Sequence, residues 1–500
     1  MSTDINSWLA SQIVYEIFPE RFAIGKSKTP EEKLAMKCYE SYDPPYETRG
    51  WDQLPVNPSK GWDFFGGDLY GIVDHLDYLQ ELGVTTLFMT PIFSSPSNHK
   101  YDTTDFFTID EQFCGKEALI ELIKQLKQRD MHLFLDIAMN HVRDTHQWFL
   151  DAKRNKKPKR DFFTFGQGGS YLCWHDFRHQ PELNLVNETL QGKLFRDSNS
   201  ALQQYLDMGV DGFRFDAAND VGMPIINKIR EALRQRFPNA VMIGEVTNFA
   251  GEWIDQNDKY HGVMNYYFHG ALYAWLQGNI SSTQLNYCVE EYYRGYGKKG
   301  AIYSWNILSS HDTPRLRNFL ADKKQRKLAV VAQFTLPGVP FIYYGEEIGM
   351  AGEGDPDCRR PMIWDENQWD KEIFDFYRHL IAIRKSRAEL QYGDFVMLGH
   401  KLSTDALAFL RHTEKPDEAA IIVINNSGMH LKQKLFVPCA HIYHQLRLKD
   451  LLSGDTTEVQ IGGGIDLDIP PYTAVILVPD DTKFVDYKFF KPRNLLLSDL

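Results

Sequence analysis

Cysteine is scarce in this sequence. The chain has 500 residues and six cysteines, and no two cysteines form a Cys-x-x-Cys pair. The six are Cys38, Cys114, Cys173, Cys288, Cys358 and Cys439. This scattered spacing argues against a disulfide framework and against the paired cysteines typical of metal sites. We therefore expect reduced thiols, as in a cytosolic protein, and no metal ligands among them.

Long apolar runs are also missing. No apolar stretch approaches the roughly 18 residues that a membrane helix needs. The most apolar region, 329–344, is interrupted by Pro337, Gly338 and Pro340. Residues 1–18 do not combine a charged segment with an apolar core, so no secretory signal is visible. These absences predict a cytoplasmic protein with no membrane partner.

The sequence has no excess of positive charge. Its 55 lysines and arginines stand against 67 aspartates and glutamates, which gives a net charge of −12. Binding to nucleic acid irrespective of sequence needs a positive field, so we expect no nucleic-acid partner. The one basic run, residues 153–160, is interpreted as a solvated loop because nothing basic flanks it.

Short apolar runs alternate with amphipathic helical patterns through most of the chain. Helical spacing is clearest in 72–82, 117–127, 223–236 and 324–335. The expected strands are 12–18, 84–89, 132–137, 210–215, 240–244, 263–267, 303–308 and 339–344. Eight strands alternating with helices favour a (β/α)8 barrel over an open doubly wound sheet. No Gly-x-Gly-x-x-Gly segment follows a predicted strand, which weakens the dinucleotide-binding alternative.

Two regions depart from this alternation. Residues 142–195 are too long for an ordinary loop and predict an inserted subdomain after the third strand. After about residue 392 the helical spacing stops and β-branched, alternating runs follow. The predicted organisation is barrel in 1–141 and 196–391, inserted domain in 142–195, and an antiparallel C-terminal β-sandwich domain in 392–500.

Carboxylates follow four of the predicted barrel strands. Asp136, Asp216, Glu245 and Asp312 stand at the ends of the third, fourth, fifth and seventh predicted strands, where a barrel of this kind places its active site. A single such acid is more often part of a structural ion pair. Four acids converging on one rim favour a site, because buried carboxylates are costly unless they are paired or used.

Crowded carboxylates suit the cleavage of glycosidic bonds. That reaction needs one carboxylate at the anomeric carbon and one carboxylic acid at the leaving oxygen. Arg214 points to the same side of its strand as Asp216, so we expect it to lower the pKa of Asp216. Glu245, among apolar residues and like charges, is expected to have a raised pKa and to serve as the acid. A metal-dependent hydrolase is the alternative, although no His-Glu-x-x-His motif occurs.

Four segments in order resemble the conserved regions of the α-amylase family of retaining glycoside hydrolases. They are DIAMNHV at 136–142, GFRFDAAND at 212–220, GEV at 244–246 and SHDT at 310–313. Each short motif is weak by itself, whereas the four in this order and spacing are specific.

The resemblance implies a role for each matching residue. Asp216 is the nucleophile, Glu245 the general acid/base and Asp312 the stabiliser of the transition state. Substrate-binding roles fall to Tyr101, His141, Arg214 and His311, with Asp136 and Asn140 behind them. Within the family, the segments SNHKYD at 97–102 and DPDCRR at 355–360 resemble the cyclomaltodextrinase, neopullulanase and maltogenic amylase group. By that resemblance, Asp355 and Arg359 line the −2 subsite; the alternative for 355–360 is a salt-bridged surface loop.

The sequence departs from that group in two ways. Its members carry an extra N-terminal β domain, whereas the first predicted barrel strand here begins near residue 12. The Asn/Asp-rich loop that binds calcium in relatives is not evident in 20–34, although Gly66-Gly67-Asp68 matches. We therefore expect no required cofactor, and a structural calcium lacks support from this loop.

These features together predict a retaining α-glucan hydrolase. Its expected partner is an α-glucan oligosaccharide, either a maltooligosaccharide or a cyclomaltodextrin, cleaved at α-1,4 bonds, with α-1,6 bonds as an open alternative. A glucanotransferase or a sugar isomerase such as a trehalose synthase would use the same residues. A non-catalytic carbohydrate-binding member is a further alternative. It is disfavoured because Asp216, Glu245 and Asp312 are all present.

Overall fold

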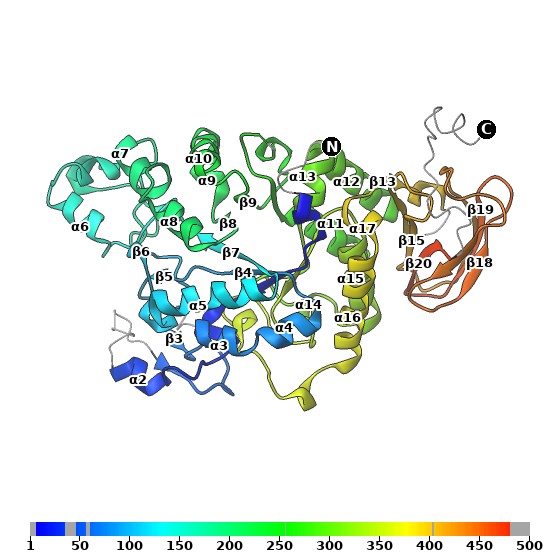
Figure 1. The fold of residues 1–500 in the computed structure, drawn as a ribbon, viewed down its shortest axis with the longest axis horizontal. Coiled ribbons are helices and arrows are strands. Elements are labelled where there is room, and N and C mark those ends of the chain that lie inside the picture. The colour runs from blue at the N-terminus through cyan, green and yellow to red at the C-terminus, as the bar shows by residue number, and fades with distance from the viewer. Residues whose placement is uncertain (1–6, 36–46, 57–60, 256, 403–404, 481–500) are drawn as a thin grey trace, which may run out of the picture.

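A closed barrel of eight parallel strands forms the centre of the molecule (Figure 1). The computed structural model describes residues 7–35, 47–56, 61–255, 257–402 and 405–480. The barrel strands are β1 (Val14–Ile17), β4 (Thr86–Met89), β7 (His132–Ile137), β8 (Gly212–Phe215), β9 (Val241–Val246), β10 (Gly262–Asn265), β11 (Trp305–Ile307) and β12 (Val339–Tyr343). Each strand pairs with the barrel strand before and after it in the sequence, and β12 closes onto β1. The predicted (β/α)8 barrel is confirmed.

The inside of the barrel changes from apolar to polar along the strands. Residues two apart in a strand share a face. Phe134, Ile243 and Trp305 accordingly belong to one buried cluster inside the barrel. One step further along, the same face carries Asp136 on β7 and Glu245 on β9. The apolar layer therefore forms a floor beneath the carboxylates.

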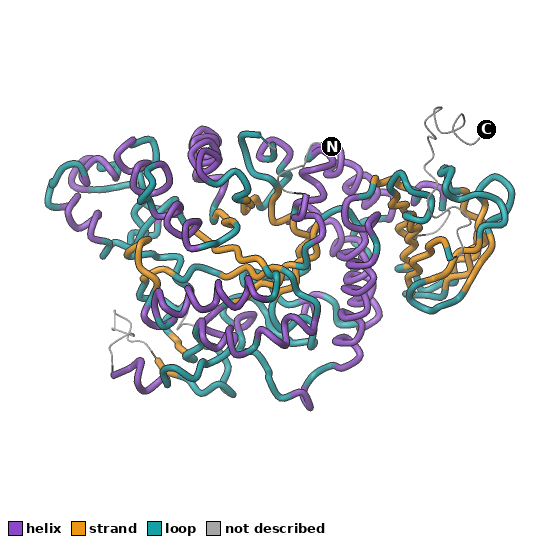
Figure 2. The backbone as a smooth tube through the Cα atoms, viewed as in Figure 1, coloured by secondary structure: helices purple, strands orange, loops and turns teal. Residues whose placement is uncertain are grey.

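Helices surround the barrel, as Figure 2 shows in purple around the orange strands. They are α1 (Pro19–Phe22), α2 (Pro30–Ala35), α3 (Leu69–Asp74), α4 (Leu76–Leu82), α5 (Gly115–Gln128), α8 (Ala201–Met208), α9 (Ala218–Val221), α10 (Met223–Arg236), α11 (Tyr266–Leu276), α12 (Ser282–Gly295), α13 (Gly297–Tyr303), α14 (Leu316–Phe319), α15 (Lys323–Thr335), α16 (Lys371–Ser386) and α17 (Ala388–Tyr392).

The helices expected at 117–127, 223–236 and 324–335 are confirmed by α5, α10 and α15. The single helix predicted over 72–82 is wrong, because two helices, α3 and α4, meet at His75. The His75 ring bonds the carbonyl of Gly71 at 2.8 Å and packs against Trp364, with ring centroids 3.8 Å apart. This tertiary contact, which periodicity does not reveal, accompanies the break.

The segment after β7 is an insertion. It contains α6 (Gln147–Lys153), α7 (Glu188–Gln191) and short bridges, such as the one between His141 and Glu182. In Figure 1, α6 and α7 lie at one end of the molecule. Two further small pairings, β2 (Glu47–Thr48) with β3 (Asp63–Phe64) and β5 (Phe93–Ser94) with β6 (Asp105–Ile109), lie outside the barrel.

Antiparallel strands form the C-terminal part, at the opposite end in Figure 1. One sheet has the order β13 (Asp394–Met397), β14 (Ala406–His412), β15 (Ala419–Asn425), β20 (Thr473–Pro479), β17 (Arg447–Asp450) and β18 (Thr456–Glu458). A second sheet pairs β16 (Leu431–Phe436) with β19 (Gly464–Ile469). Apolar residues from both sheets share one core.

Two further features concern the whole described chain. Within the described ranges, none of the helices has the length and apolar character needed to cross a bilayer. The cysteines at 114, 173, 288, 358 and 439 are free, and Cys38 lies outside the described residues.

Candidate active site

One buried arginine joins three of the predicted site acids. Arg214 on β8 lies opposite Asp136 on β7 in the strand register. Its Nη1 donates to both oxygens of Asp136, at 2.8 and 2.7 Å, and to Asp216 Oδ1 at 2.8 Å. Its Nη2 lies 2.9 Å from Glu245 Oε1. A guanidinium with five fixed donors is suited to hold several carboxylates at once, and here it supplies the positive charge among them.

Burial is the largest influence on the pKa values of Asp216 and Glu245. Burial raises the pKa of Glu245 to about 7, against the opposing charge of Arg214. This direction is the one expected from the sequence. Burial also raises the pKa of Asp216 to about 6, although Arg214 lowers it. The expectation of a net lowering for Asp216 was wrong, because burial and the charges of Asp136 and Asp312 outweigh the arginine. Glu245 still holds its proton to higher pH than Asp216.

Asp312 has the opposite character. Its Oδ2 lies 3.0 Å from Nε2 of His311, and its Oδ1 accepts from Nη2 of Arg359 at 3.0 Å. Burial raises the pKa of Asp312, but His311 and Arg359 together bring it well below its ordinary value. Asp312 is therefore ionised over a pH range in which Glu245 keeps its proton, a contrast that suits acid–base chemistry.

Glu16 on β1 is a member of this site that the sequence analysis missed. Its fully buried carboxylate lies 2.5 Å from Nδ1 of His311. Burial alone would lower the pKa of His311, but Asp312 and Glu16 raise it to about 10. The sequence feature that could have identified Glu16 is its position as the single acidic residue of the otherwise apolar strand Val14–Ile17.

We expect Glu16→Gln to weaken the dependence of stability on alkaline pH. The pKa of His311 is raised in the folded state from 6.5 to about 10. Its protonated form therefore stabilises the fold fully below pH 6.5, and this contribution is lost as the pH rises through about 10. Glu16→Gln removes one cause of the shift, so its melting temperature should fall less between these pH values. Thermal melts from pH 6.5 to 10 check this, with the exposed Glu117→Gln as control. Parallel curves for wild type and Glu16→Gln would contradict it.

The loop at 355–360 contributes to the site as well as to its own structure. Arg359 reaches Asp312 with Nη2 and lies 3.1 Å from Asp355 Oδ1 with Nη1. Its Nε donates to the carbonyl of His311 at 2.8 Å. Asp357 and Arg360 instead pair with each other, at 2.7 Å. The structure thus brings Asp355 and Arg359 to Asp312, while the outer pair forms the salt-bridged loop.

Aromatic side chains join the rim to the insertion. The hydroxyl of Tyr101 donates to Asp136 Oδ2 at 2.7 Å and lies 2.6 Å from His311 Nε2. Tyr101 therefore joins two of the rim residues.

The ring of His141 stacks on Trp174 of the insertion, with centroids 4.9 Å apart. Burial lowers the pKa of His141 to about 4, so its ring is neutral. The carbonyl of the buried Asn140 accepts from Leu183 in the same insertion. No motif in the sequence marks Trp174 as a residue of the site.

The backbone after Asp216 is unusual. Ala217 has φ of 46°, in the left-handed region that a non-glycine residue rarely adopts. In this conformation its N–H donates to Glu245 Oε2 at 2.9 Å. Strain of this kind persists at functional sites where the surroundings enforce it. Here it fixes Glu245 relative to Asp216.

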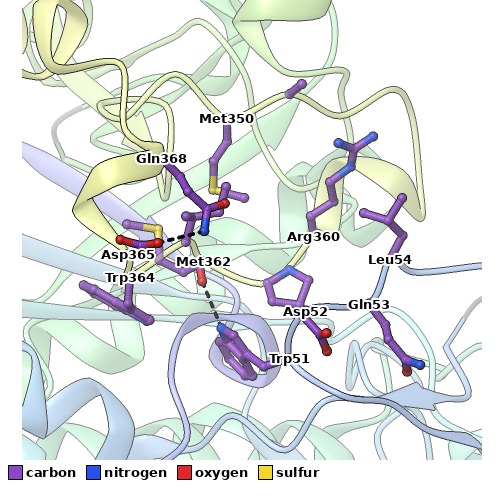
Figure 3. A pocket seen from close by; sticks show the side chains of 13 residues that line it. Trp51, Asp52, Gln53, Leu54, Met350, Arg360, Met362, Trp364, Asp365 and Gln368 are labelled. Atoms are coloured by element: carbon purple, nitrogen blue, oxygen red, sulfur yellow. Dashed lines mark hydrogen bonds between the residues drawn. The ribbon is translucent and has the colours of Figure 1, made fainter.

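A separate hollow of about 670 Å³ borders the 355–360 loop. Trp51, Leu54, Met350, Met362 and Arg360 are among its lining residues (Figure 3). The indole N–H of Trp51 donates to the carbonyl of Met362, another lining residue, at 2.9 Å. None of its lining residues is one of the rim carboxylates, although Arg360 follows Arg359 directly. It is a neighbour of the site and not its chemical centre.

The fold and this cluster define a class of protein. A (β/α)8 barrel with ionised and protonated carboxylates at its strand ends is an architecture of glycoside hydrolases. The family described as "Alpha amylase, catalytic domain" matches residues 16–393. The chain therefore belongs to the α-amylase family of glycoside hydrolases, as the resemblance in the sequence implied.

Individual proteins are similar to this chain in sequence or in structure. A cyclomaltodextrinase from a Bacillus species is 34% identical over 455 residues, which cover 85% of this chain and 76% of the relative. Neopullulanase 2 of Thermoactinomyces vulgaris is 34% identical over 491 residues, 94% of this chain and 78% of that protein. A solved cyclic α-maltosyl-(1→6)-maltose hydrolase from Arthrobacter globiformis, in complex with that sugar, is 26% identical with a TM-score of 0.78. The match covers 94% of this chain and 99% of that one.

The residues that match the family's calcium loop do not fit a calcium ion. Calcium takes six to eight oxygen ligands. Here the ammonium of Lys33 is fully buried and donates to the carbonyl of Gly66 at 2.8 Å and to Asp68 Oδ2 at 2.6 Å. The other oxygen of Asp68 accepts from the N–H groups of Gly25 and Gly71. The lysine therefore supplies the positive charge at this position.

We expect Lys33→Met to destabilise the fold by about 3–5 kcal/mol, because it leaves the buried carboxylate of Asp68 unpaired. Lys28→Met removes an exposed pair with Glu111 at 3.4 Å and should cost at most about 1 kcal/mol. Denaturant unfolding of both variants measures the difference. Added calcium chloride should leave the melting temperature of the wild type unchanged, and a rise would show that calcium binds despite Lys33.

Proposed function

We propose that this protein hydrolyses α-1,4 glucosidic bonds in maltooligosaccharides or cyclomaltodextrins, with retention of configuration. The observation that carries the proposal is the contact of one guanidinium, that of Arg214, with both Asp216 and Glu245. This contact holds the two acids together while their pKa values differ, with Glu245 the higher.

In the first step, an oxygen of Asp216 attacks C1 of the sugar. Glu245 gives its proton to the glycosidic oxygen, the C1–O bond breaks, and a covalent glycosyl ester forms on Asp216. Asp312, kept ionised by His311 and Arg359, stabilises the positive charge that develops on the sugar.

In the second step, Glu245 acts as a base. It takes a proton from water, whose oxygen attacks C1 and releases Asp216, so the configuration at C1 is retained. A sugar hydroxyl in place of water would give transglycosylation by the same residues.

The substrate class rests on the relatives. Two are named for the hydrolysis of cyclomaltodextrins and pullulan, and the solved hydrolase was crystallised with a cyclic maltosyl-maltose. That solved structure matches along 99% of its length. Cyclic α-maltosyl-(1→6)-maltose is therefore a second candidate substrate.

Product analysis tests the proposal. The purified protein is incubated with β-cyclodextrin, maltotriose, pullulan, starch and cyclic α-maltosyl-(1→6)-maltose, with Glu245→Gln alongside. We expect the wild type to open the ring and give maltose and glucose, with little action on starch. The variant should give at least about 100-fold less product in the same time. NMR of the first product should show the α-anomer. Turnover of none of these α-glucans would overturn the proposal, and longer or rearranged products would indicate a transferase or an isomerase.

A further inference from the structure

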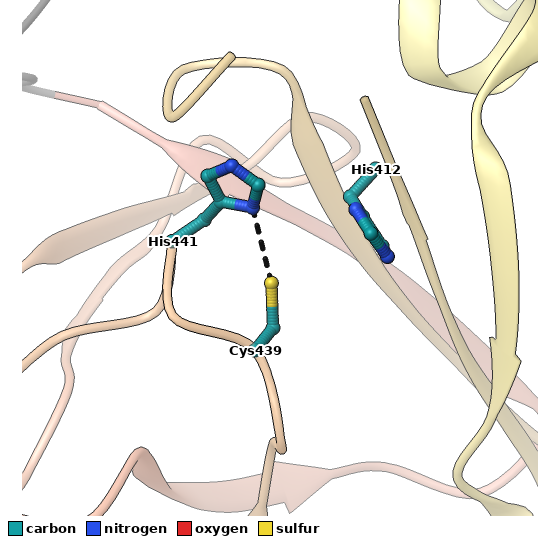
Figure 4. A group of neighbouring side chains, drawn as sticks. All are labelled: His412, Cys439 and His441. Carbon is teal, nitrogen blue, oxygen red and sulfur yellow. Dashed lines mark hydrogen bonds between the residues drawn. The ribbon is translucent and has the colours of Figure 1, made fainter. Parts of the chain in front are cut away.

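Three side chains with metal-binding atoms meet in the C-terminal part of the chain, away from the barrel rim. His412 is the last residue of β14, whereas Cys439 and His441 lie in the connection between β16 and β17. One ligand atom from each lies within 4.8 Å of the others (Figure 4). The fold therefore brings together residues that the sequence spacing does not pair.

The separations are close to those of a zinc site. Cys439 Sγ lies 3.1 Å from His441 Nδ1. Zinc bonds of about 2.3 Å to sulfur and 2.0–2.1 Å to nitrogen, arranged tetrahedrally, would place these two atoms roughly 3.6 Å apart. The ligand atom of His412, which is partly exposed at the end of its strand, lies within 4.8 Å of both, so a bound zinc ion would have to draw the three atoms closer together.

Backbone carbonyls select the nitrogen that each histidine can offer. Nδ1 of His412 lies 3.1 Å from the carbonyl of Thr413, and Nε2 of His441 lies 3.4 Å from the carbonyl of Glu414. A carbonyl only accepts, so these nitrogens carry the proton. The lone pairs then fall on Nε2 of His412 and Nδ1 of His441. Histidines that bind metals are usually oriented by such a second hydrogen bond.

A carboxylate lies in the connection that follows β14. Asp417 is five residues after His412, and its charge raises the pKa of His441 against the larger effect of burial. Its Oδ1 is shielded from solvent and has no hydrogen-bond partner among the described residues. Buried polar atoms are rarely left unpaired, and such an atom often marks an unoccupied partner. A divalent ion beside one thiolate and one carboxylate would leave the site electrically neutral.

We propose that His412, Cys439 and His441 bind one zinc ion that ties the end of β14 to the β16–β17 connection. Mixed thiolate and imidazole ligands favour zinc over calcium or magnesium. When zinc binds, Cys439 loses its thiol proton to solvent as the sulfur–zinc bond forms. The site lies in the sheet domain and takes no part in the reaction proposed for the barrel.

Metal content tests the proposal. The full-length protein is freed of metal with a chelator, loaded with zinc sulfate, passed over a desalting column and analysed by mass spectrometry for metals. We expect about one zinc ion per wild-type chain, held by the three side chains with water in the fourth position, and close to none for Cys439→Ser. Cys288→Ser, a partly buried free cysteine on α12, should keep its zinc. His412→Ala should lose most of its zinc, whereas His430→Ala, on an exposed histidine paired with Asp468, should not.

Cobalt gives an independent readout. Loading with cobalt chloride should produce a thiolate-to-cobalt charge-transfer band that Cys439→Ser lacks and Cys288→Ser retains. Absence of stoichiometric zinc in the wild type, or equal zinc in Cys439→Ser, would overturn the proposal. Hydrolysis of β-cyclodextrin by metal-free and zinc-loaded protein should occur at the same rate, so failure of the zinc site and failure of the proposed activity are separate results. Circular dichroism of each variant checks that it is folded.

Discussion

Asp216→Asn is expected to lower kcat/KM on maltooligosaccharides by about 10⁴–10⁶-fold, the scale of losing a catalytic nucleophile. An amide cannot form the glycosyl ester, while it keeps the size of the carboxylate and a hydrogen bond to Arg214. The fold should therefore persist. Initial rates on maltotriose, with circular dichroism for the fold, measure the effect.

Asp211→Asn is the matched control for this variant. Asp211 directly precedes β8, at the end of the strand remote from Asp216, and its carboxylate accepts from the N–H of Leu133 at 2.9 Å. We expect the hydrolysis rate of Asp211→Asn to stay near that of the wild type. A folded Asp216→Asn protein that retained a tenth or more of the activity would exclude Asp216 as the nucleophile.

Glu245→Gln is expected to lower kcat by about 10²–10⁴-fold on natural oligosaccharides, because the leaving oxygen then receives no proton. Substrates with good leaving groups need that proton less and should be affected less.

An α-maltosyl fluoride should still react at Asp216 in Glu245→Gln, since fluoride leaves without a proton. The glycosyl ester should then accumulate, because the variant lacks the carboxylate that activates water in the second step. Intact-mass spectrometry should show one added maltosyl group on Glu245→Gln and none on Asp216→Asn.

The pH profile gives a second check on Glu245. The first step needs Asp216 ionised and Glu245 protonated. Their pKa values of about 6 and about 7 predict that the rate rises with pH through the lower value and falls through the higher one. Glu245→Gln removes the group that titrates on the alkaline side, so its residual activity should no longer fall there. An unchanged alkaline limb in the variant would assign that limb to another group.

Much of this site could be predicted from strand periodicity. Parallel strands of a barrel end on one rim. The order of the strands therefore sufficed to place Asp136, Asp216, Glu245 and Asp312 near one another. The contact of Arg214 with Asp216 followed from their two-residue spacing on one strand. These inferences needed only local patterns and the topology that those patterns imply.

Contacts between distant segments could not be predicted in this way. The sequence alone determined the barrel, the C-terminal sheet domain and the acids on the rim, because periodicity and residue type are local properties. Only the tertiary structure decided that Glu16 holds His311, that Lys33 fills the cation position beside Asp68, and that burial outweighs Arg214 at Asp216. It also brought Cys439 to His412. Each of these depends on how far charges and ligands lie from one another and from water, and that distance is set only when the whole chain packs.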